Sequence, residues 1–419
     1  MNKFDSLTIY SIYLRNHGEF NTFETLGKDL DRIRGMGFQA IWLLPIHPIG
    51  TRNKKGALGC PYAIADYGGI NPEYGTLGDF RSFIHKAHEK GLKVIMDVVY
   101  NHTAYESKLY QEHPEFFLKD ARGNPVTKEP EWEDVIDLDY SQQALWPLLI
   151  GYLKDWAAMG VDGFRCDVAS LVPLDFWREA KKAVEAVKPG VLWLAESVHR
   201  EFLEDLRARG FEGNEDAALY EVFDILYDYD IHPAFETFVK GETALKTYIE
   251  AIRNQDAIYP PGYVKLRFIE NHDQPRFLAY GKTMKDKEKF TVLNYLLKGA
   301  VLFYAGQETD TQRTPSLFET DPIDLGHGVP SYILLVKKLN QLMAAGVFSG
   351  ESIVYEVVQE KLLIVHDPEY RFLGAVNFGQ TPLTHDFALG GDYCDVLGGR
   401  ESGPLGNSTI VDYRIFIKK

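Results

Sequence analysis

Short runs of β-branched and aromatic residues alternate with longer amphipathic stretches from the start of the chain to about residue 345. This alternation is typical of parallel strands that are joined by crossover helices. Eight runs have the length and composition of strands, and eight is the number of strands in a (β/α)8 barrel. We therefore predict an α/β fold built on a TIM barrel. The predicted strands are Leu7–Tyr13, Ala40–Leu44, Val94–Val99, Gly163–Val168, Val191–Ala195, Val222–Leu226, Val264–Ile269 and Ala300–Tyr304.

Two parts of the chain do not follow this alternation. Residues 100–141 are polar and aromatic and lack a long amphipathic stretch, and structureless insertions of this length within a compact domain are usually functional. After residue 346, strand-like runs follow one another without long helices, which indicates an antiparallel β domain. These runs are Ile353–Val358, Leu362–His366, Phe372–Asn377 and Tyr413–Ile417. We predict a barrel formed by residues 1–99 and 142–345, a short insertion domain at 100–141 after the third strand, and a C-terminal β-sandwich at 346–419.

Composition excludes several classes of protein. Hydrophobic residues make up 45% of the 419 residues, which is enough for a large core. With 45 basic and 60 acidic residues, the net charge of −15 repels a polyanion, so no nucleic acid partner is expected. The three cysteines form neither a disulfide framework nor a zinc pattern, and the chain lacks both a signal-peptide pattern and an apolar stretch of the roughly 18 residues that span a membrane. We expect a cytoplasmic protein without a membrane partner, or a secreted one if a leader was removed; the sequence does not indicate an oligomeric state.

Acidic residues and histidines follow four of the predicted strands. In a (β/α)8 barrel the carboxyl ends of the strands meet on one face, and catalytic groups gather there. We therefore expect these side chains to form one site. The four segments are Asp97-Val98-Val99-Tyr100-Asn101-His102, Gly163-Phe164-Arg165-Cys166-Asp167, Trp193-Leu194-Ala195-Glu196 and Phe268-Ile269-Glu270-Asn271-His272-Asp273.

In this order, the four segments resemble those of the alpha-amylase family of glycoside hydrolases, glycoside hydrolase family 13. The resemblance spans nearly the whole chain, because the insertion and the β tail match the second and third domains of that family. It implies a retaining hydrolase that cleaves α-glucosidic bonds, above all α-1,4 bonds, in starch-like glucans or maltooligosaccharides. Three further segments agree with it: Tyr62-Ala63-Ile64-Ala65-Asp66-Tyr67, Pro72-Glu73-Tyr74-Gly75-Thr76 and Ala305-Gly306-Gln307-Glu308.

The resemblance also implies the roles of three carboxyl groups. Asp167 would be the nucleophile that forms a covalent glycosyl intermediate, Glu196 the acid that becomes the base for water, and Asp273 a group that stabilises the transition state. Arg165 precedes Asp167 by two residues, so both side chains point to the same side of a strand, and its charge should keep Asp167 ionised. The neighbouring carboxylates should raise the affinity of Glu196 for its proton.

Further residues are expected to hold the sugar. By resemblance, His102 and His272 would form hydrogen bonds with hydroxyl groups of the sugar, and Tyr62 would stack against its face. Arg165 would also belong to the substrate-binding site. Asp97 would contact these side chains rather than the sugar itself. The chemistry requires no cofactor.

Asn101 corresponds to a residue that binds a structural calcium ion in many relatives. Its amide oxygen is a suitable hard ligand for calcium. The positions three and four residues after the nucleophile are Lys and His in typical alpha-amylases but Ser170 and Leu171 here, which weakens both the calcium prediction and the assignment to a plain endo-acting enzyme.

Several alternatives stay open. Val168, which follows the nucleophile, occurs in enzymes for α-1,4 and for α-1,6 bonds. An exo-acting α-glucosidase or oligo-1,6-glucosidase and a glucan transglycosylase share the first chemical step with an alpha-amylase. A non-catalytic carbohydrate-binding member of the family would not need the three carboxyl groups, which are all present. A metal-dependent barrel hydrolase would need a His-x-His pair, and the sequence has none.

Overall fold

The computed structural model of the chain describes residues 4–350 and 352–419. Residues 1–3 of the predicted first barrel segment and residue 351 of the predicted C-terminal domain lie outside the described residues. Among the described residues, no helix combines the length and the apolar character that crossing a membrane requires.

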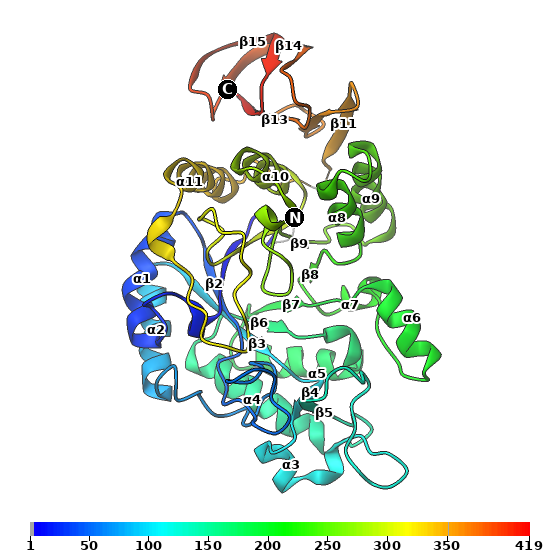
Figure 1. Cartoon of the computed structure of the whole chain (residues 1–419). Helices are drawn as coiled ribbons and strands as arrows, with labels where there is room; N and C mark the ends of the chain where they lie inside the picture. The colour runs from blue at the N-terminus through cyan, green and yellow to red at the C-terminus, as the bar shows by residue number, and fades with distance from the viewer. Residues whose placement is uncertain (1–3, 351) are drawn as a thin grey trace.

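A closed barrel of parallel strands forms the centre of the molecule, in the order β1-β10-β9-β8-β7-β6-β3-β2 (Figure 1). All eight predicted strands are found, and the predicted fold class is confirmed. The sixth and seventh strands are shorter than predicted: the sixth begins only at Ile225, and the seventh ends at Arg267. The barrel strands are β1 (Thr8–Ile12), β2 (Ala40–Leu43), β3 (Lys93–Val98), β6 (Gly163–Cys166), β7 (Leu192–Ala195), β8 (Ile225–Tyr227), β9 (Lys265–Arg267) and β10 (Ala300–Tyr304).

Helices surround the barrel, and three of them begin with a threonine that caps the first turn. Thr22, Thr76 and Thr283 each accept a hydrogen bond from the backbone N–H three residues later, and the side chain of that residue bonds back to the threonine N–H. These capping boxes satisfy N–H groups that the helix itself leaves unpaired. The helices are α1 (Phe23–Gly35), α2 (Leu77–Glu89), α4 (Leu145–Met159), α5 (Leu174–Glu185), α6 (Arg200–Ala208), α7 (Asp216–Leu219), α8 (His232–Lys240), α9 (Leu245–Ile258), α10 (Met284–Leu296) and α11 (Pro330–Ala344).

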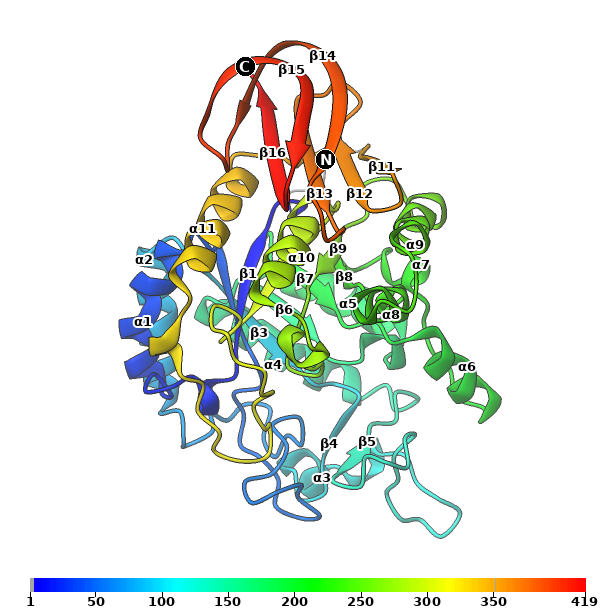
Figure 2. The ribbon, with the colours of Figure 1, turned by 45° about the horizontal axis from the view of Figure 1, so that its top comes forward.

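The insertion begins where β3 ends. Its strands β4 (His102–Ala104) and β5 (Val135–Asp137) pair in antiparallel fashion, with His102 opposite Asp137. Between them lie the short helix α3 (Lys108–Glu112) and an exposed turn that is closed by a bridge between Lys119 and Pro125. The insertion and the C-terminal domain lie at opposite ends of the barrel (Figures 1 and 2).

The C-terminal domain is one antiparallel sheet in the order β11-β12-β13-β16-β14-β15. A sandwich of two sheets was predicted, but β14 pairs with both β15 and β16, so all six strands belong to the same sheet. The sheet packs on α10 at Gly374, where an added Cβ would lie only 2.4 Å from the side chain of Leu296. The strands are β11 (Val354–Val358), β12 (Leu362–His366), β13 (Phe372–Asn377), β14 (Leu383–Asp395), β15 (Arg400–Ile410) and β16 (Tyr413–Lys418).

Candidate active site

The register of the barrel strands places the predicted catalytic groups at the same height along the barrel axis. Asp97 on β3 lies opposite Arg165 on β6, and Cys166 lies opposite Ala195 on β7. Asp167 and Glu196 each follow the last paired residue of their strands, and the Glu196 N–H donates to the carbonyl of Cys166 at 3.0 Å. The nucleophile and the acid predicted from the sequence are therefore neighbours at the carboxyl ends of adjacent strands, where barrel enzymes carry their active sites.

The guanidinium of Arg165 joins three carboxyl groups. Its Nη1 donates to Asp97 Oδ1 at 2.9 Å and to Asp167 Oδ1 at 2.8 Å, and its Nη2 lies 2.9 Å from Glu196 Oε2. Arg165 is fully buried, and the rings of Trp42 and two tyrosines lie within 6 Å of its guanidinium carbon. The side chains of Arg165 and Asp167 point to the same side of the strand, as predicted.

These contacts set the protonation of the cluster. Burial raises the pKa of Asp97, Asp167 and Glu196, while the Arg165 guanidinium lowers it. The pKa reaches about 7 for Asp97 and Asp167 and about 8 for Glu196, where Asp167 and Asp273 add to the increase. Arg165 acts on Asp167 in the predicted direction, but burial has the larger effect. Because one guanidinium does not balance three carboxylates, ionisation of all three together is disfavoured, and the added effect of Asp167 and Asp273 makes Glu196 the carboxyl group best suited to hold a proton.

In Asp167 and in Glu196, one carboxyl oxygen lies outside the contact with Arg165. Asp167 Oδ1 is bonded to Arg165, whereas Oδ2 lies 4.0 Å from the nearest histidine nitrogen, His102 Nε2. Glu196 Oε2 accepts from the N–H of Val168 at 2.9 Å, so Oε1 is the oxygen that can carry the proton. Val168 directs this N–H from a left-handed backbone conformation with φ of 35°, which is strained for a β-branched residue and typical of functional sites.

Tyr62, His272 and Asp273 also line the site. The Tyr62 hydroxyl is 2.6 Å from His272 Nε2, and the two rings are stacked with centroids 5.7 Å apart. The Tyr62 hydroxyl also donates a hydrogen bond of 3.2 Å to Asp97 Oδ2, so Asp97 contacts a residue of the site, as expected. Asp273 lies 3.1 Å from His272 Nε2, and its side chain is 37% exposed, so it is open to a ligand.

His102 is buried among these groups. Burial lowers its pKa to about 4, as it does for His272, so both rings are neutral at physiological pH. The ring of Trp132 crosses the His102 ring edge to face, with centroids 5.3 Å apart. All of the predicted catalytic and sugar-binding residues are thus brought together in one place.

The sequence matches the family described as "Alpha amylase, catalytic domain" over residues 16–324, about three quarters of the chain. The chain belongs to the alpha-amylase family.

Solved structures and curated proteins agree with this assignment. The crystal structure of an alpha-amylase from Lactobacillus plantarum is 38% identical with a TM-score of 0.94, and the match covers 100% of both chains. The alpha-amylase MalA from Haloarcula japonica is 29% identical over 72% of this chain and 43% of its own length. An alpha-1,4-glucan:maltose-1-phosphate maltosyltransferase from Rhodospirillum rubrum is 31% identical over 61% of this chain and 37% of its own length. The chain thus spans less than half the length of these two curated relatives.

In this alpha-amylase family member, the site opens into a cavity of about 210 Å³. The residues of its wall that sequence reasoning missed come from the loop after β2 and from the insertion: Lys55, Cys60, Trp132, Asp134 and Val135. Trp132 also stacks on Phe202 beside a small apolar cluster that includes Val168 and Leu171. Neither a strand pattern nor a family motif marks Lys55, Cys60, Trp132 or Asp134, although the aromatic composition of the insertion is a signal that applies to Trp132.

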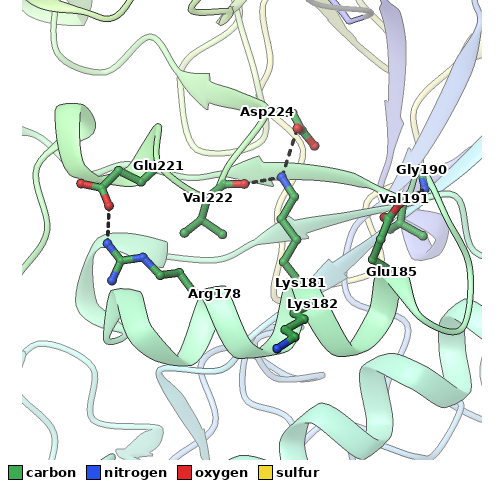
Figure 3. Close-up of a pocket in the computed structure, with 9 residues that line it drawn as sticks. All are labelled: Arg178, Lys181, Lys182, Glu185, Gly190, Val191, Glu221, Val222 and Asp224. Carbon is green, nitrogen blue, oxygen red and sulfur yellow. Dashed lines mark hydrogen bonds and ion pairs between the residues drawn. The ribbon is translucent and has the colours of Figure 1, made fainter.

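A second cavity, of about 440 Å³, lies between α5 and the segments that lead into β7 and β8 (Figure 3). Because these segments precede their strands, the cavity lies at the end of the barrel away from the site. Most of its charged side chains are bonded to one another or to the backbone: Arg178 to Glu221, Lys181 to the carbonyl of Val222 and to Asp224, and Glu185 to the N–H of Gly190. That end of a barrel contributes to stability rather than to catalysis.

Asn101 does not fit the calcium ligand that the alpha-amylase family implies. Its Oδ1 accepts a hydrogen bond of 2.7 Å from the ammonium group of Lys128, which also lies 3.1 Å from Asp137 Oδ2. Calcium requires six to eight oxygen ligands directed at one point, and here a cationic side chain occupies that direction. No cluster of three or more His, Cys, Asp or Glu side chains suited to a metal ion was found within residues 4–350 and 352–419.

Proposed function

We propose that the protein is a retaining glycoside hydrolase that cleaves α-1,4-glucosidic bonds in starch-like glucans or maltooligosaccharides. The observation that carries this proposal is the pair formed by Asp167 and Glu196, which lie side by side after adjacent strands, contact the same buried guanidinium and each leave one carboxyl oxygen outside that contact. Family membership supports the substrate class, because the alpha-amylase from Lactobacillus plantarum matches over its full length.

In the proposed first step, Asp167 Oδ2 attacks the anomeric carbon while the proton on Glu196 moves to the glycosidic oxygen. The bond between the anomeric carbon and that oxygen breaks, the leaving sugar departs with the proton, and a covalent glycosyl–Asp167 ester remains. In the second step, the Glu196 carboxylate takes a proton from water, and the water oxygen displaces Asp167. Two displacements restore the α configuration, and apart from the substrate and water they use only groups of this chain.

The remaining side chains hold the sugar and the charge. Neutral His102 and His272 supply uncharged donors and acceptors to hydroxyl groups without a further desolvation cost. Tyr62 presents an aromatic face beside them, and the exposed carboxylate of Asp273 can bond to hydroxyls of the reacting ring. Such contacts place the anomeric carbon near Asp167 and so contribute to the rate through orientation.

A glucan transglycosylase is the second candidate. The match to a maltosyltransferase supports it, and so does the apolar cluster of Trp132, Val168, Leu171 and Phe202, because its surface suits the C–H face of an acceptor sugar better than it suits water. A sugar hydroxyl would then replace water in the second step.

Product analysis distinguishes these functions. With maltoheptaose, we expect the first product to be the α anomer, measured by proton NMR within the first minutes, and we expect cleavage of starch and maltotriose but not of isomaltose or sucrose. If adding maltose at high concentration gives products longer than the substrate, transfer is the main reaction. A β anomer as the first product would contradict the retaining mechanism.

The pH dependence of kcat/KM follows from the pKa of Asp167 and that of Glu196. Because Asp167 must be ionised and Glu196 protonated, activity should rise as the pH rises through about 7 and then decline as the pH rises through about 8. With α-maltosyl fluoride, whose leaving group needs no proton, this alkaline decline should be absent. A decline of the maltooligosaccharide reaction centred below pH 6 would show that Glu196 is not held in its protonated form.

A further inference from the structure

Lys128 is a buried lysine at the junction between the insertion and the barrel. The residue is 7% exposed, and its ammonium group contacts Asn101 after β3 and Asp137 on β5. Its backbone N–H also donates to Asp137 Oδ2 at 3.0 Å, and its carbonyl accepts from the guanidinium of Arg209, just after α6. A lysine is rarely buried to this degree unless its charge is paired. The contacts with Asn101 and Asp137 provide that pairing and hold the ammonium group in place.

Both acceptors of the Lys128 ammonium are directly connected to His102. Asn101 precedes His102 in the sequence, and Asp137 lies opposite His102 in the pairing of β4 and β5. His102 Nε2 in turn is 4.0 Å from Asp167 Oδ2. A chain of contacts therefore leads from Lys128 to the proposed nucleophile.

The orientation of the Asn101 amide determines the tautomer of His102. Because an ammonium group can only donate, the amide oxygen of Asn101 must face Lys128, and the amide nitrogen then faces His102 Nδ1 at 3.1 Å. The amide nitrogen is also only a donor, so His102 Nδ1 must be the acceptor. The single proton of the neutral ring is therefore on Nε2, the nitrogen that faces Asp167.

We propose that the Lys128 ammonium takes the place of a bound metal cation at this junction and, through Asn101, holds His102 in the tautomer with the proton on Nε2. Lys128 is then a positioning residue, because it acts on the site through Asn101 and does not touch the reacting atoms. The benefit of this tautomer for sugar binding rests on the proposed function, whereas the identity of the cation and the tautomer can both be measured without substrate.

The charges at the junction favour a single internal cation. The ammonium has two oxygen acceptors at hydrogen-bond distances of 2.7 and 3.1 Å, and one of them is a carboxylate that balances its charge. The second oxygen of that carboxylate, Asp137 Oδ1, has no hydrogen-bond partner among the described residues. Removal of the lysine charge would leave a buried carboxylate without a counter-charge, which is among the most destabilising changes in a protein interior.

Thermal unfolding of the protein tests whether the Lys128 ammonium, rather than a metal ion, is the cation at the junction. We expect the Tm of the wild type to be the same in EDTA and in millimolar calcium chloride, and we expect Lys128→Met to lower it by about 5 to 10 °C. Lys128→Arg, which keeps the charge, should lose less. Lys119→Met is the matched control, because Lys119 is an exposed lysine of the same insertion, and its Tm should not change.

NMR of protein labelled with 15N-histidine tests the tautomer. The His102 signals are identified by their loss in His102→Gln, and in the wild type we expect the proton on Nε2. In Asn101→Asp both side-chain oxygens are acceptors, so His102 Nδ1 must donate and the proton should move to Nδ1. This readout does not depend on whether Lys128→Met folds.

Two results would overturn the proposal. The first is a wild-type Tm that falls in EDTA, together with calcium binding that Asn101→Ala abolishes, which would place a metal ion at the junction. The second is a His102 proton on Nδ1 in the wild type. An absence of activity on glucans, by contrast, would contradict the proposed function and leave both measurements meaningful.

Discussion

Asp167→Asn is expected to reduce turnover of a maltooligosaccharide by about 10⁴-fold or more, equivalent to about 5.5 kcal/mol of transition-state stabilisation. The amide cannot form the covalent ester with the anomeric carbon, and no second carboxylate has an oxygen in the same place. Asp97 is bonded to Arg165 and Tyr62 through its two oxygens, and the Glu196 carboxyl is needed as the acid. Steady-state rates with maltoheptaose measure the loss directly.

The same variant should keep its fold. Burial raises the pKa of Asp167, which means that the folded protein disfavours its ionised form, so replacement of the carboxylate by a neutral amide should not lower the Tm. Asp31→Asn on α1 is the matched control, because the Asp31 side chain is 75% exposed, and its activity should equal that of the wild type. A variant Asp167→Asn that kept a tenth of the wild-type rate would exclude Asp167 as the nucleophile.

Glu196→Gln is expected to lower kcat/KM for maltoheptaose by about 10² to 10⁴-fold, the usual range for loss of a general acid. The loss should depend on the leaving group. With α-maltosyl fluoride the first step needs no proton, so formation of the covalent intermediate should be much less affected, and the intermediate should accumulate because water lacks its base. Mass spectrometry of the quenched reaction detects the intermediate as a protein that is heavier by one maltosyl group.

Azide provides a sharper test of the same residue. Azide attacks without a base, so it should restore turnover of α-maltosyl fluoride by Glu196→Gln and give α-maltosyl azide. It should not give α-maltosyl azide with Asp167→Asn, which forms no covalent intermediate. Glu201→Gln on α6 is the control, because Glu201 is exposed. Equal losses for the fluoride and for maltoheptaose would contradict an acid role for Glu196.

Much of this site could be predicted because it depends on the backbone. Residues on a strand alternate between its two sides, so the two-residue spacing of Arg165 and Asp167 places them together without knowledge of any other element. The carboxyl ends of parallel strands meet on one face, which brings Glu196 and His272 to the same site. The barrel was predictable for the same reason, since each strand and helix has its own apolar pattern.

The parts that were not predicted depend on contacts between distant segments. The interaction of Lys128 with Asn101 crosses 27 positions of the sequence, and no periodic pattern indicates which donor will face a given amide. Trp132 lies in a loop, where side-chain direction follows from packing alone. In β14, residues such as Leu383 and Leu389 are only half-buried, and Gly390-Gly391 interrupts the run, so the strand lacks the continuous apolar pattern of β12.

The insertion has two parts that differ in how much they can vary. The turn between Lys119 and Pro125 is exposed and is closed by its own hydrogen bonds, such as that from the Gly123 N–H to the carbonyl of Asp120. Only a few residues later, the chain supplies Lys128 and Trp132, which contact groups of the site. A longer or different turn should therefore leave the site undisturbed, whereas changes in the following segment should alter the cavity. That segment is the region of the insertion to vary in libraries aimed at new substrate preferences.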